Sequence, residues 1–249
     1  SNGIILVSGP TGSGKTTTLY TILSELNIIG TNIVTIEDPV ESKMHGVNQV
    51  QVHHRAGLDF ASALRSILRQ DPDIIMIGEI RDSETAEIAV RSEITGHLVL
   101  STIHTNDSPT TVSRLIDMGI ENFLIGSSLV GVIAQRLVRT ICEECKYSYL
   151  PDPLEIRLMG LDKEKQYTFY KGAGCTSCNN TGYKGRTGIY EIMLVNGPIK
   201  RVIFSGGTSK DIERVAIDEG MVTLSQSCIQ KILGGITTYE EYMRVTYSI

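Results

Sequence analysis

The sequence has no tryptophan, only four phenylalanines and no long apolar run. No stretch approaches the about 18 consecutive apolar residues that a membrane-spanning helix needs, and no charged segment followed by an apolar one opens the chain. Basic clusters are also absent, since 23 Lys and Arg stand against 28 Asp and Glu, for a net charge of −5. These absences argue against an integral membrane protein and against a direct nucleic-acid partner, and they predict a cytosolic globular protein.

The chain has 249 residues, which is enough for one large or two small domains with a core that folds without staples. It opens with Ser1 rather than Met, and the residues that follow are already strand-like. We therefore expect a truncated protein, the C-terminal part of a longer chain.

A glycine-rich stretch, GPTGSGKTTTLY, occupies residues 9–20 directly after the short apolar run GIILVS. It matches the Walker A pattern, Gly-x-x-x-x-Gly-Lys-Thr, in full, between an expected strand at 3–9 and an expected helix that starts at Gly14. In such a loop, backbone N–H groups surround the β-phosphate, Lys15 reaches the β- and γ-phosphates, and Thr16 offers its hydroxyl to Mg²⁺. We expect ATP and Mg²⁺ as cofactors, bound by Gly9, Pro10, Thr11, Gly12, Ser13, Gly14, Lys15, Thr16 and Thr17.

Three further apolar runs, at 32–38, 73–79 and 97–104, predict buried strands, and helical spacing predicts helices at 60–69 and 83–94. This alternation predicts an α/β fold with a mainly parallel sheet. The stretch VNQVQVHH alternates with period two and predicts a hairpin or an edge strand. A helical pattern returns from about Pro198, where SKDIERVAIDEG carries Ser209 as an N-cap and ends in a glycine.

Carboxylates follow two of the expected strands. Glu79 ends the run IIMIGE, which resembles a Walker B strand with Gly78 in place of the usual aspartate. A carboxylate at that point can hold Mg²⁺ through water or polarise the attacking water. TIEDPVE brings Glu37, Asp38 and Glu41 to the end of the second strand, although acidic strand ends are also common surface features.

Two histidines flank the fourth expected strand, His97 at its start and His104 at its end. A lone histidine at a strand end is more often structural. His104 nevertheless lies at the carboxyl edge of the sheet, where ligands bind in open α/β folds.

Five cysteines include two Cys-x-x-Cys pairs, Cys142 with Cys145 and Cys175 with Cys178. In a reducing cytosol, thiols at this spacing are better interpreted as tetrahedral ligands to Zn²⁺ than as disulfides. The segment between the pairs is longer than the commoner separation of about 15 to 20 residues, yet CTSCNNTGYKGRTG has a glycine-rich knuckle. Cys228, in a helical pattern between apolar neighbours, is expected to be an inert core residue.

Four stretches in this order and spacing, GPTGSGKTTTLY, TIEDPVE, DPDIIMIGEIRDSETAEIAV and TGHLVLSTIHTND, resemble the secretion ATPase superfamily, most closely the type II secretion and type IV pilus assembly ATPases. The resemblance implies a RecA-like domain in a ring homo-hexamer that hydrolyses ATP. It also implies Glu37 and Glu79 as the carboxylates around Mg²⁺ and water, with His104 as a γ-phosphate sensor. Which glutamate activates water stays open.

The resemblance further implies an organisation in three parts: a RecA-like P-loop ATPase core at 1–139, a tetracysteine zinc module at 140–190 and a mainly helical region at 191–249. It implies a motor for type II secretion or for type IV pilus or pseudopilus assembly, at the cytoplasmic face of the inner membrane. The implied partners are an inner-membrane platform protein and a cytoplasmic adaptor. Assembly ATPases of this kind carry a tetracysteine module that retraction ATPases generally lack, which favours assembly.

In the resembled ATPases, a separate domain precedes the P-loop and lends cationic side chains to a neighbouring subunit's phosphates. This chain has its own arginines near the site motifs, namely Arg55, Arg65, Arg69 and Arg81. A role as surface or core-pairing residues is at least as common for arginines in such places.

Two other functions fit the sequence less well. A RecA-like motor for DNA uptake or nucleic-acid translocation would need basic loops with aromatic residues, which this acidic chain does not show. A non-enzymatic nucleotide-sensing adaptor built around the zinc module is disfavoured because Lys15, Thr16, Glu37 and Glu79 are all intact.

Overall fold

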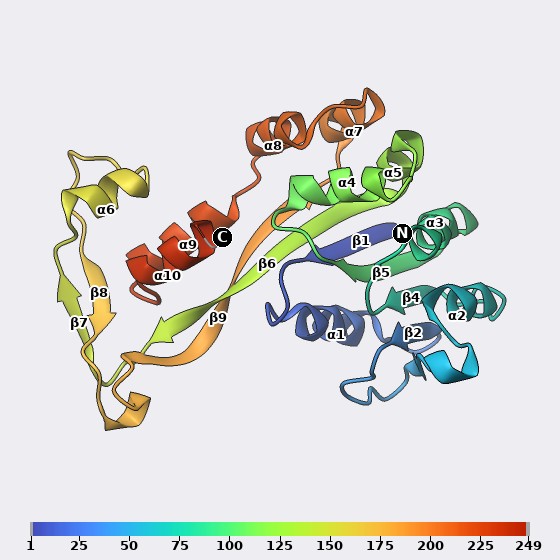
Figure 1. The fold of residues 1–249 in the computed structure, drawn as a ribbon, viewed down its shortest axis with the longest axis horizontal. Coiled ribbons are helices and arrows are strands. Elements are labelled where there is room, and N and C mark those ends of the chain that lie inside the picture. The colour runs from blue at the N-terminus through green and yellow to red at the C-terminus, as the bar shows by residue number, and fades with distance from the viewer. Residues whose placement is uncertain (1, 248–249) are drawn as a thin grey trace. The chain divides into compact units, whose positions relative to one another are not determined.

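The computed structural model describes residues 2–247 and divides into two compact units (Figure 1), residues 2–135 with 191–221, and residues 136–190 with 222–247. The sequence predicted three parts, 1–139, 140–190 and 191–249, and that division stays a prediction; the two units change after residues 135, 190 and 221. The expected C-terminal region, 191–249, is shared between the units: residues 191–221 complete the core of the first, and 222–247 belong to the second.

The first unit contains a sheet in the order β3-β2-β4-β5-β1-β6-β9. All pairs from β3 to β6 are parallel, so the expected mainly parallel sheet is confirmed. Val195 N donates to Val130 O and Cys142 N to Gly182 O, so β9 runs back along β6. The strands are β1 (Gly3–Ser8), β2 (Ile33–Glu37), β3 (Asn48–Gln51), β4 (Ile74–Ile77), β5 (Leu98–Ile103), β6 (Leu129–Ile141) and β9 (Tyr183–Leu194), the last two continuing into the second unit.

The sheet is buried on both faces because its strands alternate their side chains between two apolar cores. In β4, Ile74 and Met76 face one core, while Ile75 and Ile77 face the other. This double burial explains why the central strands read as continuous apolar runs. At the edge, β3 pairs in parallel with β2, so VNQVQVHH supplies an edge strand and not a hairpin.

Helices cover both faces of this sheet. Apolar residues of α1 (Lys15–Leu26) pack in one core, and the other core holds residues of six further helices. Figure 1 shows α7 and α8 beside α4 and α5. The six helices are α2 (Phe60–Ile67), α3 (Ser83–Ser92), α4 (Ser108–Asp117), α5 (Asn122–Ser128), α7 (Gly197–Phe204) and α8 (Ser209–Asp218), and two 3₁₀ turns, η1 (His54–Ala56) and η2 (Glu93–Thr95), belong to the same unit.

Aspartates start three of these helices. Asp59, Asp82 and Asp107 each accept a hydrogen bond from the backbone N–H three residues later, as N-caps do. The cap of α8 is Thr208, which forms a capping box with Asp211, and Ser209 is the first helical residue. The prediction of Ser209 as the cap was therefore wrong by one residue, because the Thr-Ser pair offers two hydroxyls and only the first is followed by an acidic residue three positions on.

The second unit contains an antiparallel pair, β7 (Lys146–Tyr149) with β8 (Phe169–Gly172), and helices α6 (Pro153–Leu158), α9 (Leu224–Leu233) and α10 (Tyr239–Thr246), with a 3₁₀ turn, η3 (Thr176–Cys178). Cys228 of α9 is fully buried, and burial raises the pKa of its thiol to about 12. An unreactive core cysteine is what the sequence predicted. Among residues 2–247, no helix has the length and apolar character that crossing a membrane requires.

A buried carboxylate joins β6 to α10 within the second unit. The side chain of Glu241 is 0% exposed and accepts hydrogen bonds from Arg139 N at 2.7 Å and Arg139 Nε at 2.9 Å. Arg244 donates to both oxygens, at 3.1 and 2.7 Å. Burial alone would raise the pKa of Glu241, but these donors outweigh burial and hold the pKa below its ordinary value.

We predict that Glu241→Gln lowers the free energy of unfolding by about 1–3 kcal/mol at neutral pH, because a neutral amide replaces the buried carboxylate that accepts hydrogen bonds from two half-exposed arginines. A depressed pKa contributes stability above the ordinary carboxyl pKa and loses it as pH falls through the folded value. The gap between wild type and variant should therefore narrow from about pH 5 downward. Urea unfolding followed by circular dichroism at several pH values measures both effects.

Glu164→Gln is the matched control for this substitution. Glu164 is exposed, so its replacement should change the free energy of unfolding by less than about 0.5 kcal/mol. Equal stability of Glu241→Gln and Glu164→Gln at pH 7 would contradict the prediction.

Candidate active site

The expected site residues gather at the carboxyl edge of the parallel sheet. β1 leads into the glycine-rich loop, β5 into His104, β4 into Glu79, and β2 ends in Glu37. These strands are neighbours in the order β2-β4-β5-β1 and lie about 4.8 Å apart. The fold thus brings four distant sequence motifs to one edge.

The loop between β1 and α1 leaves the N-terminus of α1 available to an anion. Its N-cap is Gly14, in the left-handed conformation with φ 86°, and no side chain of the described chain caps this helix. Three aspartates cap other helices of the unit, so α1 differs from α2, α3 and α4. Free N–H groups and the helix dipole favour phosphate at such an end.

Backbone packing explains the first glycine of the loop. Gly9 has φ 143°, and a Cβ there would lie 2.3 Å from the carbonyl oxygen of Gln135 and 2.7 Å from Ser13 Oγ. The buried side chain of Gln135 also holds the loop, since its Nε2 donates to Ser13 O at 2.6 Å and its Oε1 accepts from Thr18 Oγ1 at 2.6 Å. The loop therefore depends on close contact with β6.

Lys15 lies close enough to Glu79 for the carboxylate to affect the charge of the lysine. Lys15 is 9% exposed, and its Nζ donates to Gly9 O at 2.8 Å and Pro10 O at 3.0 Å. Burial lowers the pKa of Lys15, and the negative charge of Glu79 partly offsets that effect. The structure thus brings together two residues that the sequence singled out in different motifs, one at the start of α1 and one after β4.

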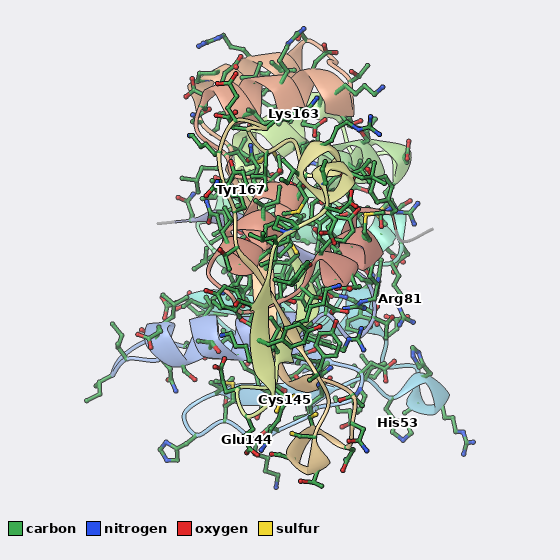
Figure 2. All side chains as sticks on the ribbon, turned by 90° about the vertical axis from the view of Figure 1, so that its left-hand side faces the viewer. His53, Arg81, Glu144, Cys145, Lys163 and Tyr167 are labelled. Carbon is green, nitrogen blue, oxygen red and sulfur yellow. The ribbon has the colours of Figure 1, made fainter. Side chains whose placement is uncertain are left out.

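Glu79 also lies close to a guanidinium and an imidazole. Its Oε2 lies 2.5 Å from Arg81 Nε and 3.5 Å from His104 Nε2, and its side chain is 13% exposed. Both contacts involve the same oxygen, so Oε1 is the atom that these partners leave for a water or a metal ion. Arg81 itself is largely exposed and is labelled in Figure 2.

Glu37 is held in a different way. Glu37 is buried, with 3% of its surface exposed, and its carboxylate accepts three hydrogen bonds from neutral donors. Thr35 Oγ1 donates to Oε1 at 2.6 Å, Gln49 Nε2 donates to Oε1 at 3.1 Å, and Tyr20 Oη donates to Oε2. Burial and the carboxylate both raise the pKa of Tyr20, which keeps its hydroxyl protonated as a donor.

The glycine that replaces the usual Walker B aspartate has a steric explanation. Gly78 N donates to Ile36 O at 2.7 Å, and a Cβ on Gly78 would lie 3.2 Å from that oxygen and 3.4 Å from Glu37 Cα. Such contacts are tight for any larger residue. Gly78 therefore lets β4 pass close to the strand end that carries Glu37.

Other candidates lie away from this cluster or at its margin. His97 stands at the opposite end of β5, where its Nδ1 is 2.8 Å from Thr95 Oγ1, and so lies away from the cluster. Asp38 is 3.5 Å from His54, on the surface. Glu41 lines an open hollow of about 800 Å³ beside α1, together with Thr16 and Thr17. Arg55 and Arg69 are exposed, and Arg65 pairs with Glu84.

The loop fits a nucleotide phosphate by its own chemistry. Ser13 Oγ is buried and has no hydrogen-bond partner among residues 2–247. Gly12 has φ 77°, and a Cβ added to it would meet no described atom within 4 Å, so its backbone faces open space. Thr16 and the two glutamates supply the oxygen ligands that Mg²⁺ prefers. Their individual roles stay predictions.

The four cysteines of the second unit converge as the sequence predicted. The Sγ atoms of Cys142, Cys145, Cys175 and Cys178 all lie within 4.8 Å of one another. Three of the separations are 3.7, 3.8 and 3.9 Å. A tetrahedral zinc site with Zn–S bonds of about 2.3 Å places its sulfurs about 3.8 Å apart, so this cluster fits Zn²⁺. Cys145 is labelled in Figure 2, beside Glu144.

Backbone N–H groups point at these sulfurs. Gly174 N donates to Cys145 Sγ at 3.3 Å, and both Cys175 N and Gly182 N donate to Cys178 Sγ at 3.2 Å. Burial alone would raise the pKa of Cys178, but its backbone donors and neighbouring thiols lower it to about 6. Such donors stabilise thiolates, the form that binds metal.

Sequence reasoning missed the residues that hold the site. Gln135, Thr35 and Gln49 lie within or beside strands, and Tyr20 lies in the apolar pattern of α1. A glutamine directly after the apolar run LVGVIA was the one available signal, because an amide buried beside such a run needs hydrogen-bond partners.

Comparison with known proteins places this architecture in context. The family model described as type II/IV secretion system protein matches residues 1–244. The type II secretion system protein E of Dickeya dadantii is 50% identical over 98% of this chain and 49% of its own length. The type IV pilus assembly ATPase PilB of Myxococcus xanthus is 53% identical over 96% of this chain and 43% of its own length.

Among solved structures, the crystal structure of the pilus retraction motor PilT with bound ADP superimposes with a TM-score of 0.74 and 31% identity. The match covers 98% of this chain and 61% of that one. The chain thus spans about half the length of the curated relatives it matches.

We predict that Gly9→Ala destabilises the first unit more than Gly12→Ala does. Both replacements place an alanine at a positive φ, which destabilises the folded state by about 1–2 kcal/mol. Gly9→Ala adds a collision with Gln135 O, which should cost about 1–3 kcal/mol more. Urea unfolding compares the two variants, and equal losses would contradict the steric role of Gly9.

Proposed function

Because the chain belongs to the type II/IV secretion system protein family, we propose that it is the ATP-hydrolysing motor domain that powers type II protein secretion or type IV pilus or pseudopilus assembly. The observation that carries this proposal is the cluster of Lys15, Glu79 and His104 beside the uncapped start of α1. The names of the relatives support the two kinds of machine.

Lys15 and the loop backbone bind the triphosphate. Lys15 Nζ exchanges its bonds to Gly9 O and Pro10 O for oxygens of the β- and γ-phosphates. Ser13 Oγ and the first N–H groups of α1 add neutral donors. Thr16 contributes its hydroxyl to Mg²⁺, which neutralises phosphate charge when bound.

Glu79 is the residue best suited to activate water. Arg81 and His104 hold its Oε2, and Oε1 accepts the hydrogen bond of the attacking water. The water oxygen forms a bond to the γ-phosphorus while the bond to the β–γ bridging oxygen breaks, and a water proton passes to the carboxylate. His104, next to Glu79, is placed to respond to the γ-phosphate.

Glu37 serves the metal side of the site in this proposal. Three hydrogen bonds already fix the orientation of its carboxylate, which leaves it less free than Glu79 to turn toward an attacking water. A fixed carboxylate can instead orient the water shell of Mg²⁺, as oxygen ligands around this ion usually do.

The proposal extends to the assembled machine. The motor acts as a ring homo-hexamer at the cytoplasmic face of the inner membrane, driving an inner-membrane platform protein through a cytoplasmic adaptor. The relatives' names support only the coarser part of this proposal, a component of a secretion or pilus assembly machine.

The tetracysteine cluster binds one structural Zn²⁺ per chain in this proposal. Cys142 and Cys145 come from the turn between β6 and β7, and Cys175 and Cys178 come from the η3 knuckle. Zn²⁺ ties these segments together when bound. Four thiolates close the coordination sphere, as is typical of structural and not catalytic zinc sites.

We predict that Lys15 and Glu79 act at different steps. Lys15→Ala should abolish ATP binding, whereas Glu79→Gln should bind ATP and lose on the order of 100-fold to 1000-fold in turnover, the typical cost of one electrostatic stabiliser. ATP affinity and turnover are measured in the full-length protein.

Glu84→Gln provides the control for the charge change, because Glu84 is an exposed glutamate that pairs with Arg65. It should keep wild-type turnover. Wild-type turnover in Glu79→Gln would show that the water-activating role is misassigned.

We also predict one Zn²⁺ per chain in protein purified without chelator. Chelation should unfold the second unit and spare the first, because the metal supplies much of the folding free energy of small cysteine modules. Cys142→Ser should lose the metal, whereas Cys228→Ala, outside the cluster, should keep it. Elemental analysis and thermal unfolding measure these outcomes. Protein that contains no zinc would overturn the assignment.

A further inference from the structure

Tyr20 connects the phosphate-binding helix to a carboxylate on the sheet. It lies in α1, four residues after Thr16, so the two side chains stand on the same face of the helix, one turn apart. Its hydroxyl donates to Glu37 Oε2, at the end of β2. Tyr20 and Thr16 also line the same hollow beside α1.

The other two donors to Glu37 come from the sheet. Thr35 lies two residues earlier in β2, and Gln49 lies in the adjacent strand β3. These two hydrogen bonds fix the carboxylate relative to the strands and do not involve α1. Of the three, Tyr20 alone ties Glu37 to the element that carries Lys15 and Thr16.

A carboxylate accepts about four hydrogen bonds in all. Three are taken in Glu37, two at Oε1 and one at Oε2, so the remaining capacity lies mainly at Oε2, on the side of Tyr20. Tyr20 donates to that same oxygen. Its hydroxyl therefore controls the direction in which the last lone pair points.

We infer that Tyr20 is a positioning residue that fixes Glu37 relative to Thr16 and thereby raises the affinity of the nucleotide complex for its divalent cation. The inference rests on the proposed function, since the cation enters with the nucleotide at the P-loop. Outer-shell partners of this kind typically change metal affinity by about 10-fold to 100-fold.

Tyr20→Phe tests this role because it removes one oxygen and keeps the ring. Mn²⁺ is titrated into full-length protein saturated with a non-hydrolysable ATP analogue, and free Mn²⁺ is followed by electron paramagnetic resonance. The variant should bind Mn²⁺ at least about 10-fold more weakly than wild type. Its affinity for the nucleotide analogue without divalent cation should stay within about 2-fold, because Lys15 and the loop are untouched.

Tyr183→Phe is the matched control. Its hydroxyl is also buried in part and hydrogen-bonded, 2.8 Å from Thr238 Oγ1, but it belongs to the second unit. A general effect of losing one tyrosine hydroxyl, about 1 kcal/mol of stability, should appear in both variants. Only Tyr20→Phe should change Mn²⁺ binding.

Two results would overturn the inference. Identical Mn²⁺ titrations for wild type and Tyr20→Phe would show that the hydroxyl does not position the cation site. An equal loss of nucleotide affinity with and without Mn²⁺ would show that Tyr20 only stabilises the loop.

The Lys15→Ala variant separates this inference from the proposed function. If wild type binds nucleotide and Lys15→Ala does not, an unchanged Tyr20→Phe titration refutes the positioning role alone. If wild type binds no nucleotide, the proposed function fails and the positioning role fails with it.

Discussion

The site depends on one constraint, which is that α1 must begin without a side-chain cap. An uncapped helix leaves N–H groups for phosphate, but it also removes the bonds that normally fix the first turn. Gln135 of β6 supplies other hydrogen bonds in their place: it donates to Ser13 O and accepts from Thr18 Oγ1. Gly9 must then be a glycine, because the loop backbone approaches Gln135 O so closely. Anion binding and local stability are thus supplied by different elements.

Charge balance at the strand ends follows from the same arrangement. Lys15 is buried, so a nearby negative charge stabilises its ammonium more than it would in bulk water. Glu79 supplies that negative charge and is itself held by Arg81 and His104. Glu37, by contrast, is surrounded by neutral donors. Two glutamates at neighbouring strand ends therefore have different environments: one contacts an arginine and a histidine, and the other is fixed by hydrogen bonds from neutral donors.

The sequence predicts well those features of the fold that depend on a local pattern of residues. The central strands and the loop follow from apolar runs, glycines and Lys15, and the carboxyl edge follows from parallel connections. Strand order does not, because it depends on which apolar faces pack together across the whole unit. Tyr20 was not predicted either, since its ring fits the helical pattern and only the approach of α1 to β2 reveals its hydroxyl. The sequence also did not show that residues 191–249 are divided between the two units. The helices α7 to α10 have similar amphipathic patterns, so the pattern does not indicate which core each helix joins.

The second unit shows why two polar clusters accompany a small apolar core. Its helices are short, with six residues in α6 and eight in α10, and short helices gain little stability from their own backbone. Small cores of this kind usually need additional cross-links. The cysteines join the β6–β7 turn to the η3 knuckle, and Glu241 joins β6 to α10. Arg139 also stacks on Tyr183, 4.0 Å from the ring centre, so the ion cluster reaches β9 as well. Both strands that continue from the first unit are therefore anchored by directional bonds, which hold their registers where apolar packing alone would allow slippage.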